Sequence, residues 1–187
     1  MEVDWILDTI YPLPAISKAA LVATLQEVSY PKGHILLRAQ KVETSVYFIK
    51  TGMVRAYHST AETEVTFWFG QEGDPVISMK SYIENKKGYE DVELLENTVL
   101  YQISSQKLHA LFNEDLHIAN WGRKLAEQEL IKTEERLIAM QFKTATQRYK
   151  DLLEQQPRLL NRVSLGHIAS YLGITQVSLS RIRAEIR

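Results

Sequence analysis

The chain has 187 residues, no cysteine and a formal net charge of −1, with 45% apolar and 24% charged residues. Its length and composition predict a folded chain of one large or two small domains. The lack of cysteine excludes disulfides, thiolate metal sites and a thiol nucleophile. No apolar run approaches the roughly 18 residues of a membrane span, and the acidic start, MEVDW, lacks the pattern of a signal peptide. We therefore expect a cytoplasmic protein without a membrane partner.

The charge is unevenly distributed along the chain. The segment from Lys143 to Arg187 carries eight Lys and Arg residues against three acidic ones, so its net charge is near +5, whereas the preceding part is near −6. This asymmetry favours a nucleic-acid-binding tail joined to a body that binds something else. A solvated basic surface would show the same balance, so charge alone leaves both interpretations open.

The first helix is predicted between Pro14 and Val28, where apolar residues recur at helical spacing. The residues expected on its inner side are Ile16, Ala20, Leu21 and Leu25.

Short β-rich runs follow from Tyr30 to Ser104. They are HILLRA, SVYFIK, MVRAYH, EVTFWFG, DVELL and TVLYQIS, and turn residues separate them. Two of the runs flank Thr51-Gly52 and predict a β-hairpin. Six or more short strands at this spacing predict an antiparallel sandwich or small barrel.

A helical pattern resumes at SSQKLHALF, and residues 113–142 then run without Pro or turn clusters. At 1.5 Å per residue such a helix is about 40 Å long, which exceeds the width of a small domain. One apolar stripe contains Ile118, Trp121, Leu125, Ile131, Ile138 and Phe142. A second stripe favours a twin helix from another subunit, although a helix sandwiched within one chain is the alternative. The expected dimer interface is Leu116, Ala119, Arg123, Ala126, Leu130, Thr133 and Leu137.

Pro157 breaks the helical pattern before a compact C-terminal module. Its apolar positions fit a helix-turn-helix, with Ser164 and Thr175 as helix caps and Gly173 at the turn between the helices. The residues expected inside it are Ile168, Ala169, Leu172, Ile174, Leu179 and Ile182.

With that face buried, the start of the last helix presents side chains that suit a DNA major groove. The predicted base-reading residues are Gln176, Val177, Ser180 and Arg181. The predicted phosphate contacts are Thr175, Ser178 and Arg183, with Arg148, Arg158, Arg162 or Arg187 as further candidates. Any small three-helix domain shows a similar periodicity, but the spacing from Ala169 to Gly173 and on to the apolar residues favours DNA binding.

The order of β-roll, long helix and terminal helix-turn-helix resembles the Crp/Fnr superfamily of bacterial transcription regulators. The resemblance covers nearly the whole chain and rests on YPKGHILLRA, VYFIKTGMVRAYH, EVTFWFGQEGDPV, LLENTVLYQIS and SLGHIASYLGITQVSLSRIRAEIR, with Gly33, Gly52 and Gly73 at turns. It implies a homodimer joined along the long helix, an effector pocket inside the β-roll and a pseudo-palindromic operator. RNA polymerase is a further partner that the resemblance suggests.

The cyclic-nucleotide cassette of that family is altered in this chain. Where the cyclic-nucleotide binders carry a glutamate and an Arg-Ser pair, this sequence has Ser78 and Gly88-Tyr89, and the acidic pair Glu90-Asp91 follows at once. Those acids would repel a phosphate. We therefore do not expect cAMP to bind, and no cofactor or metal is identified. The effector is unknown, or there is none, and aromatic side chains are a candidate filling of the degenerate pocket: Phe67, Trp68, Phe69 and Tyr89.

The expected architecture is α+β: an antiparallel β-roll of jelly-roll type, a long dimerisation helix and a helix-turn-helix without an evident wing. The expected domains are residues 1–113, 114–142 and 143–187. A cupin-type metal enzyme is a poor alternative, because His58 lacks the second histidine such a site needs. The remaining alternative is a ligand-binding or protein-interaction module whose helix-turn-helix does not read DNA.

Overall fold

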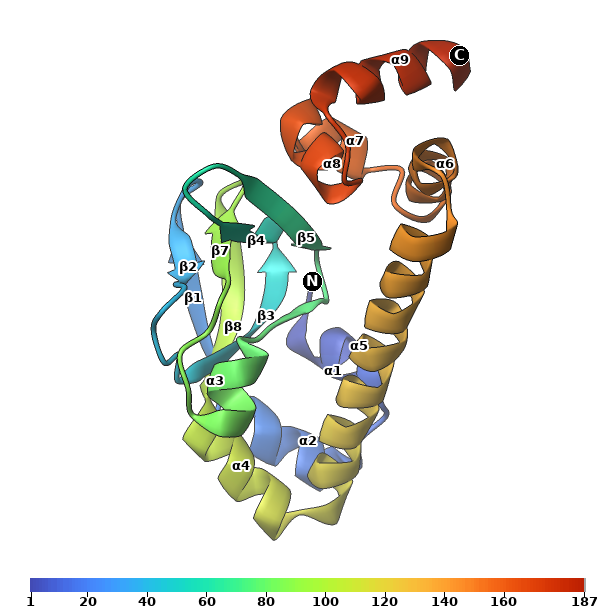
Figure 1. Cartoon of the computed structure of the whole chain (residues 1–187). Coiled ribbons are helices and arrows are strands. Elements are labelled where there is room, and N and C mark those ends of the chain that lie inside the picture. Colours follow the sequence, from blue (N-terminus) through green and yellow to red (C-terminus); the bar gives the residue numbers. More distant parts are fainter. Residues whose placement is uncertain (187) are drawn as a thin grey trace.

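The computed structural model describes residues 1–186 and has three parts in chain order. Two antiparallel four-stranded sheets form a β-roll, a long helix runs beside it, and four short helices lie at the far end of that helix (Figure 1). The predicted α+β class and the order of the parts are confirmed. No helix within residues 1–186 is long and apolar enough to cross a membrane.

Every strand pairing within the β-roll is antiparallel. One sheet has the order β1-β8-β3-β6 and the other β2-β7-β4-β5, so β5 lies at an edge. The strands are β1 Gln26–Tyr30, β2 Ile35–Leu37, β3 Ser45–Thr51, β4 Val54–Ser59, β5 Glu64–Gly70, β6 Pro75–Val76, β7 Asp91–Leu94 and β8 Thr98–Ser104.

The predicted hairpin around Thr51-Gly52 is wrong, because β3 and β4 belong to different sheets. The chain crosses from one sheet to the other at Gly52, whose φ of 122° is accessible to glycine at little cost. A Cβ atom at this position would overlap the side chain of Thr98. Gly52 therefore serves a sheet-to-sheet crossing rather than a two-residue hairpin turn.

The N-terminal helices α1 (Val3–Ile10) and α2 (Ala15–Val22) differ from the single predicted helix of residues 14–28. The predicted helix ends early because the chain from Gln26 onward joins a sheet as β1. Leu21 is buried as expected, but Ile16 is 86% exposed. The predicted inner position of Ile16 is therefore wrong, as is that of Ala20, which is also exposed.

The hydrophobic core has one layer between the sheets and another between the β1-β8-β3-β6 sheet and the surrounding helices. In the second layer Trp121 is fully buried, its ring centroid lies 5.8 Å from that of Phe48, and its indole N–H donates to the carbonyl oxygen of Leu7 at 3.0 Å. Trp121 belongs to α5 (Leu116–Phe142), which follows α4 (Ser105–Glu114). These contacts fix the first half of α5 against the β-roll.

The C-terminal module contains α6 Ala145–Gln155, α7 Leu159–Arg162, α8 Leu165–Tyr171 and α9 Gln176–Ile186. Its helices α8 and α9 form the predicted helix-turn-helix, in which Gly173 takes the positive φ of 66° that the turn needs. The Ser164 hydroxyl caps α8 by accepting from the backbone N–H of His167. Residues 143–186 form only helices and turns.

Candidate nucleic-acid interface and effector pocket

The exposed face of α9 carries the four predicted base-reading residues. Leu179 and Ile182 are buried against the rest of the module and fix the rotation of the helix about its axis. On the opposite face Gln176, Val177 and Arg181 are exposed, as is Ser180. The structure thus places together, on one accessible surface, the side chains that the sequence assigns to base contacts.

The predicted phosphate contacts lie at the start of α9 and one turn beyond. The Thr175 hydroxyl accepts from the backbone N–H of Ser178 at 3.1 Å and lies 2.9 Å from the Ser178 hydroxyl. Thr175 therefore caps α9, as the sequence predicts. Arg183 is half-buried, and no ion pair within residues 1–186 involves it or Arg181.

Two arginines proposed as further phosphate contacts are engaged inside the chain. Arg148 donates to the carbonyl oxygens of Leu172 at 2.7 Å and of Lys143 at 2.6 Å. It therefore satisfies the C-terminal end of α8, where helical carbonyls lack partners. Arg162 is held by carboxylates of the β-roll. The prediction of free phosphate contacts is wrong for these two, whereas Arg158 is exposed and Arg187 lies outside the described residues.

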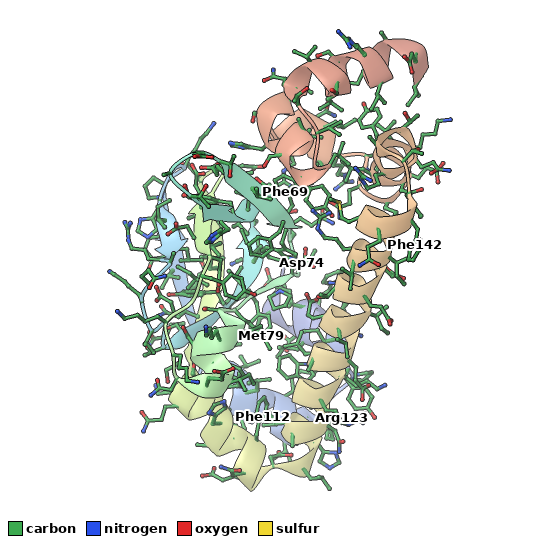
Figure 2. The ribbon with its side chains drawn as sticks, viewed as in Figure 1. Phe69, Asp74, Met79, Phe112, Arg123 and Phe142 are labelled. Carbon is green, nitrogen blue, oxygen red and sulfur yellow. The ribbon has the colours of Figure 1, made fainter. Side chains whose placement is uncertain are left out.

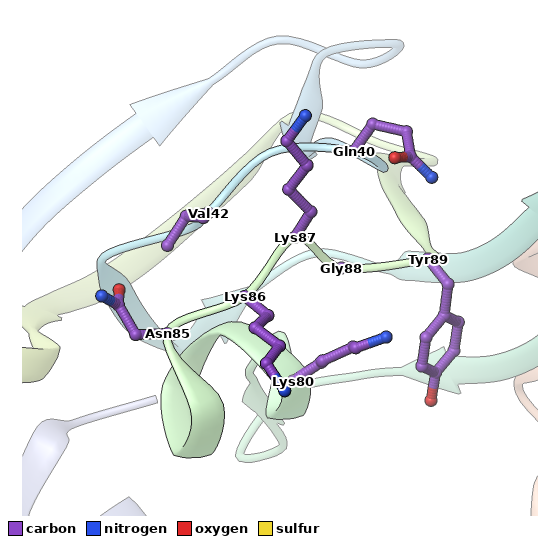
Figure 3. Close-up of a pocket in the computed structure, with 8 residues that line it drawn as sticks. All are labelled: Gln40, Val42, Lys80, Asn85, Lys86, Lys87, Gly88 and Tyr89. Atoms are coloured by element: carbon purple, nitrogen blue, oxygen red, sulfur yellow. The ribbon is translucent and has the colours of Figure 1, made fainter.

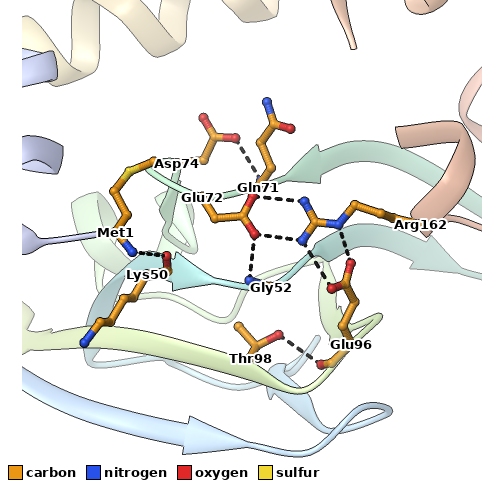
Figure 4. A network of polar contacts seen from close by, with 9 residues as sticks. All are labelled: Met1, Lys50, Gly52, Gln71, Glu72, Asp74, Glu96, Thr98 and Arg162. Atoms are coloured by element: carbon orange, nitrogen blue, oxygen red, sulfur yellow. Dashed lines mark hydrogen bonds and ion pairs between the residues drawn. The ribbon is translucent and has the colours of Figure 1, made fainter. Parts of the chain in front are cut away.

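Arg162 on α7 forms ion pairs that join the C-terminal module to the β-roll (Figure 4). Its guanidinium nitrogens lie 2.8 and 2.9 Å from the Glu72 carboxylate oxygens and 2.5 and 3.2 Å from those of Glu96. Burial by itself raises the pKa of Glu72, but hydrogen bonds from Arg162 and from the Gly52 backbone outweigh it and lower the pKa to about 2. The same pairs raise the pKa of Arg162.

A second contact between the modules joins α8 to the edge strand β5. The Ser170 hydroxyl accepts from the Thr66 backbone N–H at 2.9 Å and donates to the Glu64 carbonyl at 3.0 Å. Next to it, the Tyr171 ring packs 5.1 Å from the Phe69 ring. Sequence reasoning missed this contact, because the partners are about a hundred residues apart and no local pattern relates them.

Tyr171 also contacts the long helix. The Arg136 guanidinium lies 3.7 Å from the centroid of the Tyr171 ring, and it donates to the Tyr171 carbonyl at 2.7 Å. Burial lowers the pKa of Arg136. Tyr171 is thus held between β5 and α5, so one side chain of the helix-turn-helix touches both other parts of the molecule.

The residues of the altered cassette pack closely against one another. Ser78 is 3% exposed, and its hydroxyl donates to that of Ser81, on the short helix α3 (Met79–Glu84), at 3.2 Å. A Cβ atom on Gly88 would lie 2.6 Å from the Ser78 hydroxyl, which shows how closely the two predicted pocket residues meet. The buried carboxylate of Glu90 accepts from the Tyr89 backbone N–H. A phosphate here would meet the buried Glu90 carboxylate, which lies two residues beyond Gly88.

The aromatic residues expected to fill the degenerate pocket do not pack together at one site. Phe69 is buried against the C-terminal module, not inside the β-roll, so its predicted role is wrong (Figure 2). Tyr89 is 52% exposed, and its ring lies 6.3 Å from that of Phe67. Phe67 and Trp68 do pack against the core between the sheets.

A surface pocket of 480 Å³ adjoins the cassette (Figure 3). Its lining residues are Gln40, Val42, Lys80, Asn85, Lys86, Lys87, Gly88 and Tyr89. All three lysines are exposed, and Lys86 is paired with Glu84 at 2.9 Å. The three lysines thus lie on the solvent-exposed surface.

The predicted dimer seam on α5 is largely exposed in the single chain. Leu116, Leu130 and Leu137 are 75%, 68% and 57% exposed. Arg123 pairs with Glu127 of its own helix. Within the other stripe Ile118, Trp121 and Leu125 are buried, whereas Ile131, Ile138 and Phe142 remain exposed. The second half of α5 therefore carries apolar side chains that the β-roll does not cover, with Phe142 at its end (Figure 2).

Comparisons with known proteins agree with this architecture. Residues 27–115 match the model of the cyclic nucleotide-binding domain. Among solved structures, FixK2 from Bradyrhizobium japonicum is 23% identical with a TM-score of 0.76, and the match covers 87% of this chain and 84% of FixK2. The c-di-GMP-responsive regulator CLP from Xanthomonas campestris is 18% identical with a TM-score of 0.72, covering 92% and 91%.

A transcriptional regulator of the Crp/Fnr family from Eubacterium rectale is 17% identical with a TM-score of 0.72, covering 93% of this chain and 85% of that one. Comparison with curated protein sequences gives no match. The fold shared with these structures combines a β-roll, a long helix and a C-terminal helix-turn-helix. Residues 27–115 resemble the cyclic nucleotide-binding domain, and the chain as a whole shares the fold of these Crp/Fnr transcriptional regulators.

Proposed function

We propose that this protein is a sequence-specific DNA-binding transcriptional regulator that binds a pseudo-palindromic operator as a homodimer. The observation that carries the proposal is the surface of α9. There Gln176, Val177, Ser180 and Arg181 are exposed on a helix anchored by buried Leu179 and Ile182. Arginine and glutamine pair bidentately with guanine and adenine in the major groove, and a valine methyl suits thymine.

The exposed seam of α5 supports a homodimer. Leucines at 130 and 137 are separated by one heptad, which is the spacing that keeps apolar side chains on one face of paired helices. A two-fold dimer would present two α9 helices to DNA and match a two-fold symmetric operator, with half-sites about 34 Å or one helical turn apart. RNA polymerase is the partner through which such a regulator would act.

We propose further that the protein is controlled by a ligand other than cAMP or by none. The buried Glu90 carboxylate and the contact between Gly88 and Ser78 support this, because they place a negative charge and close packing at the cassette, whereas the nearby lysines lie on the exposed surface. Titration calorimetry with cAMP is expected to show no saturable binding to the purified chain. Saturable binding would contradict the proposal about the effector and leave DNA binding untouched.

Selection from a random pool of duplex DNA tests the DNA-binding function. The purified protein, without added ligand, is incubated with the pool at moderate salt and the retained sequences are read. A two-fold symmetric motif with half-sites about 10 base pairs apart is expected. Retention of unrelated, salt-sensitive sequences alone would contradict ligand-free sequence reading.

A further inference from the structure

Helix α8, which docks the helix-turn-helix on the β-roll, carries an ionisable group. His167 lies on α8, three residues before Ser170, whose hydroxyl holds the edge of β5. The His167 Nδ1 atom is buried and has no hydrogen-bond partner within residues 1–186. A neutral imidazole tolerates this position, since its proton can sit on the other ring nitrogen.

The β-roll carries a buried cation whose charge acts on His167. Arg55 on β4 is 5% exposed and pairs with Glu64 of β5 at 2.5 Å and Glu93 of β7 at 2.7 Å. These three side chains are the charged groups that act on His167 across the contact. Because Arg55 already holds both carboxylates, a protonated imidazole would place a second cation and an unpaired buried N–H in the same place.

We propose that protonation of His167 lifts α8 off the edge of β5, so that mild acid loosens the helix-turn-helix module from the β-roll. Burial first, and then the charge of Arg55, lower the pKa of His167, while Glu93 and Glu64 act in the opposite direction. The docked state therefore favours the neutral ring. Docking is fully favourable above the ordinary histidine pKa of about 6.5 and weakens as the pH falls below it.

The ion pair between Arg162 and Glu72 also joins the two modules. It persists at neutral and mildly acidic pH, since the pKa of Glu72 is about 2. Arg162 thus tethers α7 to the β-roll while α8 separates from β5. The motion expected on protonation is a hinge at α7 rather than complete release.

Fluorescence transfer between two dyes on the full chain measures this motion without DNA. The chain has no cysteine of its own, so Glu62→Cys in the β4–β5 turn and Ala184→Cys on α9 provide unique attachment points at exposed positions. Transfer efficiency is expected to change between about pH 7.5 and about pH 5, with a midpoint below the ordinary histidine value of about 6.5. Ser170→Ala supplies the signal of the loosened state at neutral pH.

His167→Gln, which cannot be protonated, is expected to keep the neutral-pH efficiency throughout this range. The matched control His117→Gln removes an exposed histidine on α5 and is expected to retain the full response. Circular dichroism of each variant checks that the helices remain formed. A pH response in His167→Gln equal to that of the unsubstituted chain, or no response in the unsubstituted chain, would overturn the proposal, whatever the protein does with DNA.

Discussion

The Arg162 guanidinium donates two parallel hydrogen bonds of 2.8 and 2.9 Å to the carboxylate of Glu72, although the two residues lie 90 positions apart in the sequence. This two-point geometry is the most specific form of arginine–carboxylate pairing. It joins α7 to the loop between β5 and β6, and the Gly52 backbone N–H donates to the same carboxylate at 3.0 Å. The crossing between the sheets and the position of the helical module therefore depend on one side chain.

Glu72→Gln is expected to destabilise the chain in a pH-dependent manner. The pKa of Glu72 is lowered from 4.5 to about 2, which corresponds to about 3 kcal/mol of stabilisation by the ionised form. A lowered carboxyl pKa stabilises the fold above the ordinary value, and that stabilisation disappears as the pH falls toward the folded-state value. Urea unfolding of both proteins should give a difference that shrinks between about pH 5 and about pH 2.

The control for that series is Glu62→Gln, which changes an exposed carboxylate in the β4–β5 turn. It is expected to change the free energy of unfolding by less than about 0.5 kcal/mol. A Glu72→Gln difference that stayed constant with pH would show that the ionised carboxylate is not what stabilises the contact.

Arg181→Ala and Arg183→Ala are expected to affect DNA binding differently. Arg181 lies on the exposed face of α9, so its loss should cost about 1–3 kcal/mol and relax specificity at one base pair in each half-site. Arg183→Ala should weaken binding to all sequences alike and reduce the salt dependence by about one counterion per site. Binding titrations on single-base operator variants separate the two patterns, and identical profiles would argue against base reading by Arg181.

Leu130→Glu combined with Leu137→Glu is expected to convert the proposed homodimer to monomers. Both leucines are more than half exposed in the single chain, so the substitutions should be tolerated by the monomer fold and costly only when two helices pair. Sedimentation equilibrium measures the mass. Glu135→Ala, at an exposed position outside the seam, is the control and should leave the dimer intact; a double variant that remained dimeric would place the interface elsewhere.

Gly173→Ala and Gly166→Ala are expected to have opposite effects on stability. At Gly173 the φ of 66° disfavours any side chain, so alanine should cost about 1 kcal/mol or more. Gly166 lies within α8, and a Cβ there would meet no atom closer than 3.7 Å. Alanine should stabilise that helix by about 0.5–1 kcal/mol. Thermal unfolding compares the two, and equal shifts would contradict the assigned turn.

The order of the parts of this fold could be predicted from the sequence, but not every pairing of its strands. Alternating apolar residues identify β3 and β4 as strands whether or not they pair with each other. The crossing at Gly52 depends on the contact with Thr98, nearly fifty residues away. The same reason explains the error at Ile16, since an isolated apolar residue does not show which face of a short helix other elements will cover.

The exposed and buried faces of α9 could be predicted because they depend on local spacing within α8 and α9. The roles of Arg148 and Arg162 could not, because a count of basic residues does not show which of them serve carbonyls or carboxylates elsewhere in the chain. From its position in the sequence, Arg148 resembles a DNA-binding cation. In the structure its guanidinium instead donates to the Leu172 carbonyl at the C-terminal end of α8. The roles of these arginines depend on partners that are distant in the sequence, and so does the contact between Ser170 and β5.

The Ser170 hydroxyl also covers part of a strand edge that would otherwise be open to another chain. An uncovered edge strand offers unpaired backbone groups on which another chain can add a strand, and proteins commonly protect such edges. Here α8 covers part of the β5 edge by bonding to Thr66 and Glu64. A β-roll expressed without its C-terminal module would therefore expose the unpaired edge of β5 and the ring of Phe69. We expect it to aggregate under conditions in which the full chain does not.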